Sequence, residues 1–142
     1  MKQIKHLLIL SAVMIGLIAC AADAQKKEGT AKDGVEVLYF HGKQRCATCQ
    51  AIEKETKALV NSQFADAVKS GKVRFRVIDI TKSENKALAD KYEITWSSLI
   101  LVKYKNGKET SENLTQLAFA KARSNPEQFK KELAAKINQL LK

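Results

Sequence analysis

Two cysteines separated by two residues are the strongest chemical signal in this sequence. Cys46 and Cys49 enclose Ala47-Thr48, and thiols at this spacing can close a disulfide with each other or bind a soft metal. The pair follows an apolar segment typical of a buried strand and precedes a segment with helical periodicity. That position favours dithiol–disulfide exchange, whereas a static disulfide and a thiol-bound metal remain alternatives.

Exchange requires a thiolate, and the surroundings of Cys46 favour one. We expect Cys46 at the start of a helix, where unpaired N–H groups and the helix dipole stabilise an anion. Arg45 adds a fixed positive charge beside it. Both effects should lower the pKa of the Cys46 thiol and make it the attacking nucleophile. Cys49, one turn later, is then expected to resolve the mixed disulfide.

His41 and Glu53 are supporting candidates for proton transfer. His41 could accept the proton of the resolving thiol, because imidazole titrates near neutral pH, or it could simply bond a backbone carbonyl. Glu53 lies four residues after Cys49 and therefore over the same helical face. It could take the proton of Cys49 or be an ordinary surface charge.

The alternative of a metal site is weaker but stays open. A structural zinc ion usually needs four protein ligands, and only His41 lies near the two cysteines in sequence. Copper(I) could bind two thiolates alone. We predict no dedicated metal site and no cofactor, with soft-metal carriage through the same thiols as the alternative.

The elements that must position these residues alternate between strand and helix patterns. Period-two or continuous apolar runs predict four strands, at 35–41, 73–80, 99–102 and 109–114. Helical spacing predicts helices at 49–70, at 83–92, at 117–123 and from Asn125-Pro126 onward.

Three local signals refine this assignment. Asn61-Ser62 is a possible break in the long first helix, and Gly71 is its expected end. Asn106-Gly107 predicts a hairpin that makes the fourth strand an antiparallel edge. Strands joined by a helix are expected to be parallel. The chain is therefore predicted to be α/β, with a central four-stranded mixed sheet flanked by helices.

The N-terminal segment predicts export. Met1–His6 is basic and Leu7–Ala22 is uncharged, a pattern typical of a secretory signal and short for a spanning helix. Leu17-Ile18-Ala19-Cys20 resembles a bacterial lipobox, which implies a lipid on Cys20. Ala22-Asp23-Ala24 offers an alternative cleavage site that would yield a soluble periplasmic protein.

The chain accordingly divides into three parts. Residues 1–19 are the predicted lipoprotein-type signal peptide, residues 20–33 a flexible tether, and residues 34–142 one domain. The expected location is the cell envelope, on the periplasmic or surface side, anchored in the membrane.

The charge of the chain narrows the classes of partner. The formal net charge is +10, from 25 basic and 15 acidic residues. The basic residues are scattered and lack the interleaved aromatics of a nucleic-acid groove. A solvated basic surface is the simplest interpretation, and an acidic partner or anionic lipid headgroups remain possible.

Several segments resemble the thioredoxin family. Val-Arg-Phe-Arg-Val-Ile-Asp-Ile resembles its second core strand, and Leu-Ile-Leu-Val-Lys-Tyr-Lys-Asn-Gly-Lys the strand and hairpin after the loop that faces the active site. With Cys-Ala-Thr-Cys at the start of the first helix, the similarity covers about Val35 to Lys142. It implies a three-layer thioredoxin-like fold in the order β-α-β-α-β-β-α.

A narrower resemblance concerns the region of the motif. Tyr-Phe-His-Gly followed by Arg-Cys-Ala-Thr-Cys-Gln-Ala-Ile-Glu is similar to a bacterial group labelled nitrophenyl-compound nitroreductase subunit. This implies a partner with nitro-reducing activity, because the chain shows no flavin or nicotinamide site of its own.

The sequence departs from the common family pattern at the motif and opposite it. The family has Trp before the first cysteine and Gly-Pro between the two, where this chain has Arg45 and Ala47-Thr48. The family's cis-proline loop corresponds to Thr95-Trp96-Ser97-Ser98, with Ser97 or Ser98 at the place of the proline. A trans loop is expected here.

Two consequences follow for the site. Trp96 could form an apolar lip for a partner or simply pack. The family's buried acidic residue on the strand before the motif is absent, and the nearest titratable residues are His41 and Glu36.

The resulting functional hypothesis is an exported thiol–disulfide oxidoreductase. It would transfer electrons to or from disulfides of an envelope partner protein through Cys46 and Cys49, with reduction, oxidation and isomerisation all open. The alternative is a non-enzymatic thioredoxin-like lipoprotein that binds a partner protein or a soft metal through the same thiols.

Overall fold

The computed structural model describes residues 32–142. The predicted signal peptide, the lipidation site Cys20 and most of the predicted tether therefore lie outside the described residues. No helix within 32–142 is long and apolar enough to cross a membrane. The elements, in chain order, are β1 (Gly34–His41), α1 (Ala47–Gln63), α2 (Ala65–Lys69), β2 (Val73–Asp79), the 3₁₀ turn η1 (Ser83–Asn85), α3 (Lys86–Lys91), β3 (Ser98–Lys105), β4 (Lys108–Asn113), α4 (Thr115–Lys121) and α5 (Pro126–Leu141).

The four strands form one mixed sheet in the order β2-β1-β3-β4. β1 and β2 are parallel, as expected for strands joined by a helix, whereas β3 is antiparallel to β1 and β4 to β3. β2 and β3 are also joined by a helix, but they run in opposite directions on either side of β1, so the expectation of parallel strands is wrong for this pair. Apolar side chains on both faces of β3 suit it to the interior of the sheet, and the arginines of β2 suit an edge.

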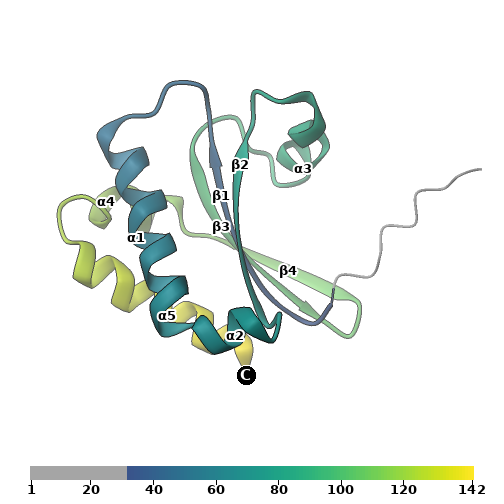
Figure 1. Cartoon of the computed structure of the whole chain (residues 1–142). Helices are drawn as coiled ribbons and strands as arrows, with labels where there is room; N and C mark the ends of the chain where they lie inside the picture. The colour runs from purple at the N-terminus through teal and green to yellow at the C-terminus, as the bar shows by residue number, and fades with distance from the viewer. Residues whose placement is uncertain (1–31) are drawn as a thin grey trace, which may run out of the picture.

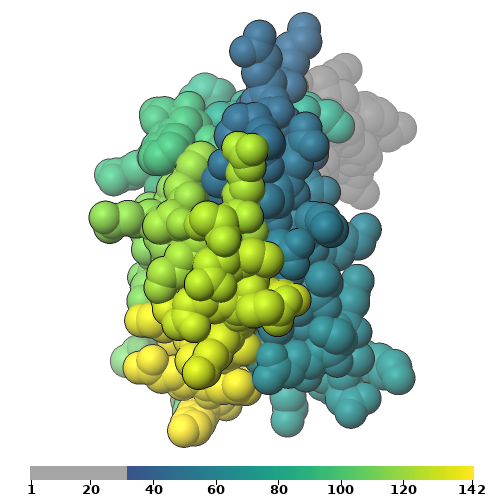
Figure 2. Space-filling model, turned by 90° about the vertical axis from the view of Figure 1, so that its left-hand side faces the viewer, coloured from purple at the N-terminus to yellow at the C-terminus, as the bar shows by residue number. Residues whose placement is uncertain are grey.

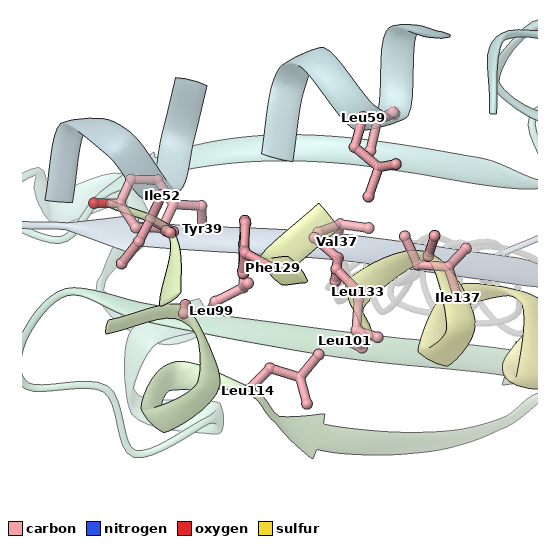
Figure 3. Close-up of a cluster of buried hydrophobic side chains, with 14 of the residues drawn as sticks. Val37, Tyr39, Ile52, Leu59, Leu99, Leu101, Leu114, Phe129, Leu133 and Ile137 are labelled. Atoms are coloured by element: carbon pink, nitrogen blue, oxygen red, sulfur yellow. The ribbon is translucent and has the colours of Figure 1, made fainter. Parts of the chain in front are cut away.

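Helices cover the two faces unequally, as Figure 1 shows. α1, α4 and α5 lie on one face, and α3 lies on the other. The larger core cluster packs between the sheet and the first group of helices, with Tyr39, Ile52, Phe129 and Leu133 among its members (Figure 3). α1 and α5 lie side by side over it, so the two halves of the chain share this core (Figure 2). The smaller cluster joins Leu38, Phe40, Ile78, Ala89, Ile94, Ile100 and Val102 beneath α3.

The first helix differs from its predicted outline at both ends. It begins at Ala47, two residues before the predicted start, and it continues through Asn61-Ser62 to Gln63. The Ser62 hydroxyl donates to the Ala58 carbonyl at 2.8 Å, which satisfies it within the helix. The break falls instead at Phe64, whose side chain packs into the larger cluster. Gly71, with φ of 74°, ends the helical segment as predicted.

The hairpin between β3 and β4 matches the Asn-Gly prediction. Asn106 and Gly107 have φ of 53° and 73°, the left-handed conformations that a type I′ turn requires. Asn125 likewise caps α5 as predicted, because its side chain accepts a hydrogen bond from the Gln128 N–H at 3.2 Å.

Candidate active site

The two cysteines lie at the start of α1, after the loop that follows β1, at one end of the sheet (Figure 1). They form a disulfide, with their Cα atoms 5.0 Å apart. Cys46 is the N-cap of α1, and its sulfur accepts a hydrogen bond from the Cys49 N–H at 3.1 Å. Cys46 is exposed, whereas only 5% of Cys49 is accessible.

This geometry distinguishes the two sulfurs chemically. An incoming thiolate can reach the exposed Cys46, while Cys49 is shielded by the fold. When the pair is reduced, the N–H group that now bonds the sulfur of Cys46 would favour its thiolate over its thiol. The arrangement therefore suits attack at Cys46 and resolution by Cys49.

Arg45 and Glu53 form an ion pair in which both side chains are about three-quarters buried. The Arg45 guanidinium also lies over the Tyr39 ring, 5.9 Å from its centroid. The Arg45 charge, which the sequence analysis expects to act on Cys46 alone, is therefore partly neutralised by Glu53. Within residues 32–142 no hydrogen bond joins Glu53 to Cys49, and the roles of Arg45 and Glu53 stay predictions.

Tyr39 is a site residue that the sequence reasoning missed. Its hydroxyl donates to the Cys49 carbonyl at 2.8 Å inside the protein. Figure 3 shows the Tyr39 side chain beneath α1, beside Ile52. Burial raises the pKa of the Tyr39 phenol and outweighs the opposite effects of Arg45 and Ser97. The phenol is thus a neutral donor, held between the strand, the motif and the loop opposite.

A signal for Tyr39 was present in the sequence. Tyr39 is the one residue with a polar side chain in the otherwise apolar run 37–40. A buried tyrosine hydroxyl normally finds a hydrogen-bond partner, so it would be expected to touch whatever follows the strand.

His41 lies at the end of β1, beside Asp79 of β2 in the strand register. Its Nδ1 is 3.0 Å from the Gly42 carbonyl oxygen, and its positive form would contribute to the lowered pKa of Asp79, which is due first to hydrogen bonds from Thr81. This backbone contact is the role that the sequence suggests for His41 as the alternative to proton transfer. Its part in proton transfer stays a prediction.

The loop before β3 carries the remaining predicted residues. Ser97 and Ser98 are buried, and the Ser98 hydroxyl donates to the Trp96 carbonyl at 3.0 Å. No cis peptide bond occurs within residues 32–142, so this loop is trans. Trp96 is 58% exposed, and its ring lies 5.2 Å from that of Phe119 on α4. Trp96 therefore both packs and presents a surface.

Comparison with known proteins identifies the fold. No protein-family model and no curated protein sequence matches the chain. Solved structures do match it. The Trx4 domain of ERdj5 is 20% identical with a TM-score of 0.51, over 78% of this chain and 82% of that one.

Two whole thioredoxins give similar results. Thioredoxin of Fasciola hepatica is 23% identical with a TM-score of 0.50, over 84% of this chain and 93% of its own. Thioredoxin of Malassezia sympodialis is 20% identical with a TM-score of 0.50, over 87% and 91%. The chain thus has the predicted thioredoxin-like fold, with Cys46 and Cys49 at disulfide distance. The narrower resemblance to the nitroreductase-subunit group stays a prediction.

Proposed function

We propose that this protein is an exported thiol–disulfide oxidoreductase that exchanges electrons with disulfides of an envelope partner protein. One observation carries the proposal: the disulfide caps a helix in a thioredoxin-like fold, with Cys46 exposed and Cys49 buried. A purely structural disulfide has no need of one accessible sulfur at a helix N-terminus.

The exchange consists of two substitutions at sulfur. The Cys46 thiolate attacks a partner disulfide, which forms a mixed disulfide and releases one partner thiolate. The Cys49 thiolate then attacks the sulfur of Cys46, which closes the intramolecular disulfide and releases the second partner thiolate. Two electrons pass to the partner, and the reverse sequence oxidises a partner dithiol.

The first test is the reduction potential of the pair. A chain that starts at Ala21 would be equilibrated in graded thiol buffers, alkylated, and analysed by mass. A potential near about −270 mV would indicate a reductant like thioredoxin, and one near about −120 mV an oxidant. If the two thiols never close a disulfide, the proposal is wrong and binding through the thiols becomes the better account.

Two cysteine variants separate the roles and seek the partner. Cys46→Ser should abolish exchange, whereas Cys49→Ser should retain the attack and accumulate mixed disulfides. Partner capture that survives in Cys46→Ser would instead favour a non-enzymatic binding protein. The disulfide-linked protein trapped by Cys49→Ser would show whether the partner has nitro-reducing activity.

Export and lipidation are part of the proposal and need their own test. In a bacterial host, Cys20→Ser should move the protein from the membrane fraction to the soluble fraction. A wild-type protein that is already soluble would indicate cleavage after Ala24 instead.

A further inference from the structure

The end of the domain opposite the disulfide carries a cluster of lysines around an apolar floor. A pocket there is lined by the start of β1, the residue before β2, the end of β3 and the end of α5. Leu140, Leu141 and Tyr104 supply its apolar part. Four lysines surround it, namely Lys72, Lys103, Lys105 and Lys142, which are called the basic pole below.

The basic pole has little acidic compensation. Within residues 32–142, none of its four side chains pairs with an Asp or Glu side chain, whereas nine other basic residues do. Asp33 is the only acidic side chain in the lining, and it accepts a hydrogen bond from the Asn106 N–H at 2.9 Å. The Lys105 ammonium donates to the backbone oxygen of Lys142 at 3.5 Å. Positive charges gathered around one pocket repel one another, and an anion between them relieves the repulsion.

The strand directions place this cluster far from the chemistry. β1 runs from the pocket, at Gly34, toward the loop that carries Cys46, and β2 runs parallel to it. β3 is antiparallel, so its end joins the pocket and its start lies beside the disulfide end. Figure 1 shows the C-terminus and the loop after β1 at opposite ends of the molecule.

The polypeptide enters the domain at the same end. Gly34 and Asp33 line the pocket, and residues 21–33 connect this point to Cys20. Cys20 lies thirteen positions before Asp33 in the sequence, and a chain of that length reaches at most about 45 Å. Under the proposed lipidation of Cys20, on which this step rests, the chain from the membrane anchor joins the domain at the basic pole.

We propose that the basic pole binds anionic lipid headgroups and orients the domain so that the disulfide faces away from the membrane. The ammonium groups would lie between lipid phosphates, and the apolar floor would meet the interfacial region. Each lysine close to an anionic membrane surface strengthens the affinity of a protein for that membrane about fivefold. The anchor would keep the protein at the membrane, and the basic pole would decide which side reaches partners.

The test uses a chain that starts at Ala21, which keeps every buried residue of the fold but lacks the lipid. Its binding to phosphatidylcholine vesicles with and without phosphatidylglycerol would be measured by sedimentation. We expect binding only with the anionic lipid, with release as salt rises. The variant Lys72→Gln, Lys103→Gln, Lys105→Gln, Lys142→Gln should bind roughly a hundredfold or more weakly.

A matched control carries the same change of charge elsewhere. Lys43, Lys57, Lys82 and Lys131 are exposed and lie outside the pocket, so replacing these four by Gln should reduce binding much less. Equal losses in the two variants, or no binding by the wild-type chain, would overturn the proposal.

The single tryptophan reports the orientation. Trp96 lies just before the start of β3, at the disulfide end, so brominated lipids should not quench its fluorescence. Strong quenching would show that the disulfide end faces the membrane and would refute the orientation. Neither measurement depends on the redox state, so failure here and failure to close the disulfide are distinguishable.

Discussion

At the scale of single residues, the site depends on a buried phenol beneath the disulfide. Tyr39 bonds the Cys49 carbonyl, so Tyr39→Phe should cost about 1 kcal/mol of unfolding free energy. Because the bond supports the oxidised first turn of α1, its loss should also raise the reduction potential by roughly 10–20 mV. Urea unfolding and thiol equilibration measure the two effects.

Tyr92→Phe provides the matched control for this variant. It removes an exposed phenol hydrogen bond of 2.8 Å to Glu109, at the edge of the smaller core cluster that Tyr92 packs against. It should lower stability without moving the reduction potential. If both variants shift the potential equally, Tyr39 has no specific role at the motif.

Replacing Arg45 and replacing Glu53, the two members of the ion pair, should have opposite effects on the reactivity of the Cys46 thiol. Glu53→Gln should free the Arg45 charge, favour the Cys46 thiolate and speed alkylation of that thiol at neutral pH. Arg45→Gln should slow the alkylation. Both rates would be measured with iodoacetamide on the reduced chain.

The same variants test the alternative role of Glu53. If Glu53 accepts the proton of Cys49, Glu53→Gln would leave alkylation of Cys46 unchanged and slow closure of the mixed disulfide. Rapid-mixing kinetics with a small disulfide separates the two steps.

At the scale of elements, the start of β1 depends on a glycine. Gly34 has φ of 148°, and a Cβ there would lie 2.6 Å from the backbone oxygen of Lys72, which also accepts the Val35 N–H. Gly34→Ala should therefore cost roughly 1–3 kcal/mol. Gly42→Ala, where a Cβ meets nothing within 4 Å, is the control and should be nearly neutral in urea unfolding.

A second element-scale prediction concerns the link between α3 and β4. Burial raises the pKa of Glu109, but hydrogen bonds from Lys91 and Tyr92 outweigh it and hold that pKa below 4.5. A lowered carboxyl pKa stabilises the fold above 4.5, and this contribution disappears as pH falls through the folded-state value. Glu109→Gln should thus be less stable than wild type at pH 7.

Acid titration of stability checks the sign of this effect. The difference between wild type and Glu109→Gln should shrink once the pH falls below 4.5. Tyr104 faces the same carboxyl and is unchanged in the variant. A difference that stays constant with pH would show that Glu109 contributes by packing alone.

At the scale of the whole molecule, one core connects the first and last elements of residues 32–142. Ile137 of α5 is fully buried in the cluster that also holds residues of α1 and β1. Ile137→Val should cost about 0.5–1.5 kcal/mol, with a single urea transition shared by Trp96 fluorescence and circular dichroism. Val77→Ala, at a site 41% exposed, should cost less. Separate transitions would indicate that α5 unfolds independently.

The sequence by itself determined the pattern of elements and the reactive pair. Apolar runs, the Asn-Gly turn, the Asn-Pro cap and the spacing of Cys46 and Cys49 are local features, and short-range sterics and hydrogen bonds decide them. The four-stranded mixed sheet followed from their order, and the thioredoxin-like fold from the resemblance of these segments to that family. Roles at the site could be suggested from residue type, but not which side chains meet.

Only the tertiary structure decided which side chains are in contact. The break at Phe64 rather than Asn61-Ser62 depends on a core contact between distant elements. The pairing of Arg45 with Glu53, and the contact of Tyr39 with Cys49, depend on how α1 packs over β1. The basic pole gathers lysines that lie up to seventy positions apart in the chain. Contacts of this kind depend on packing, which buries some side chains and brings others together irrespective of their distance in sequence.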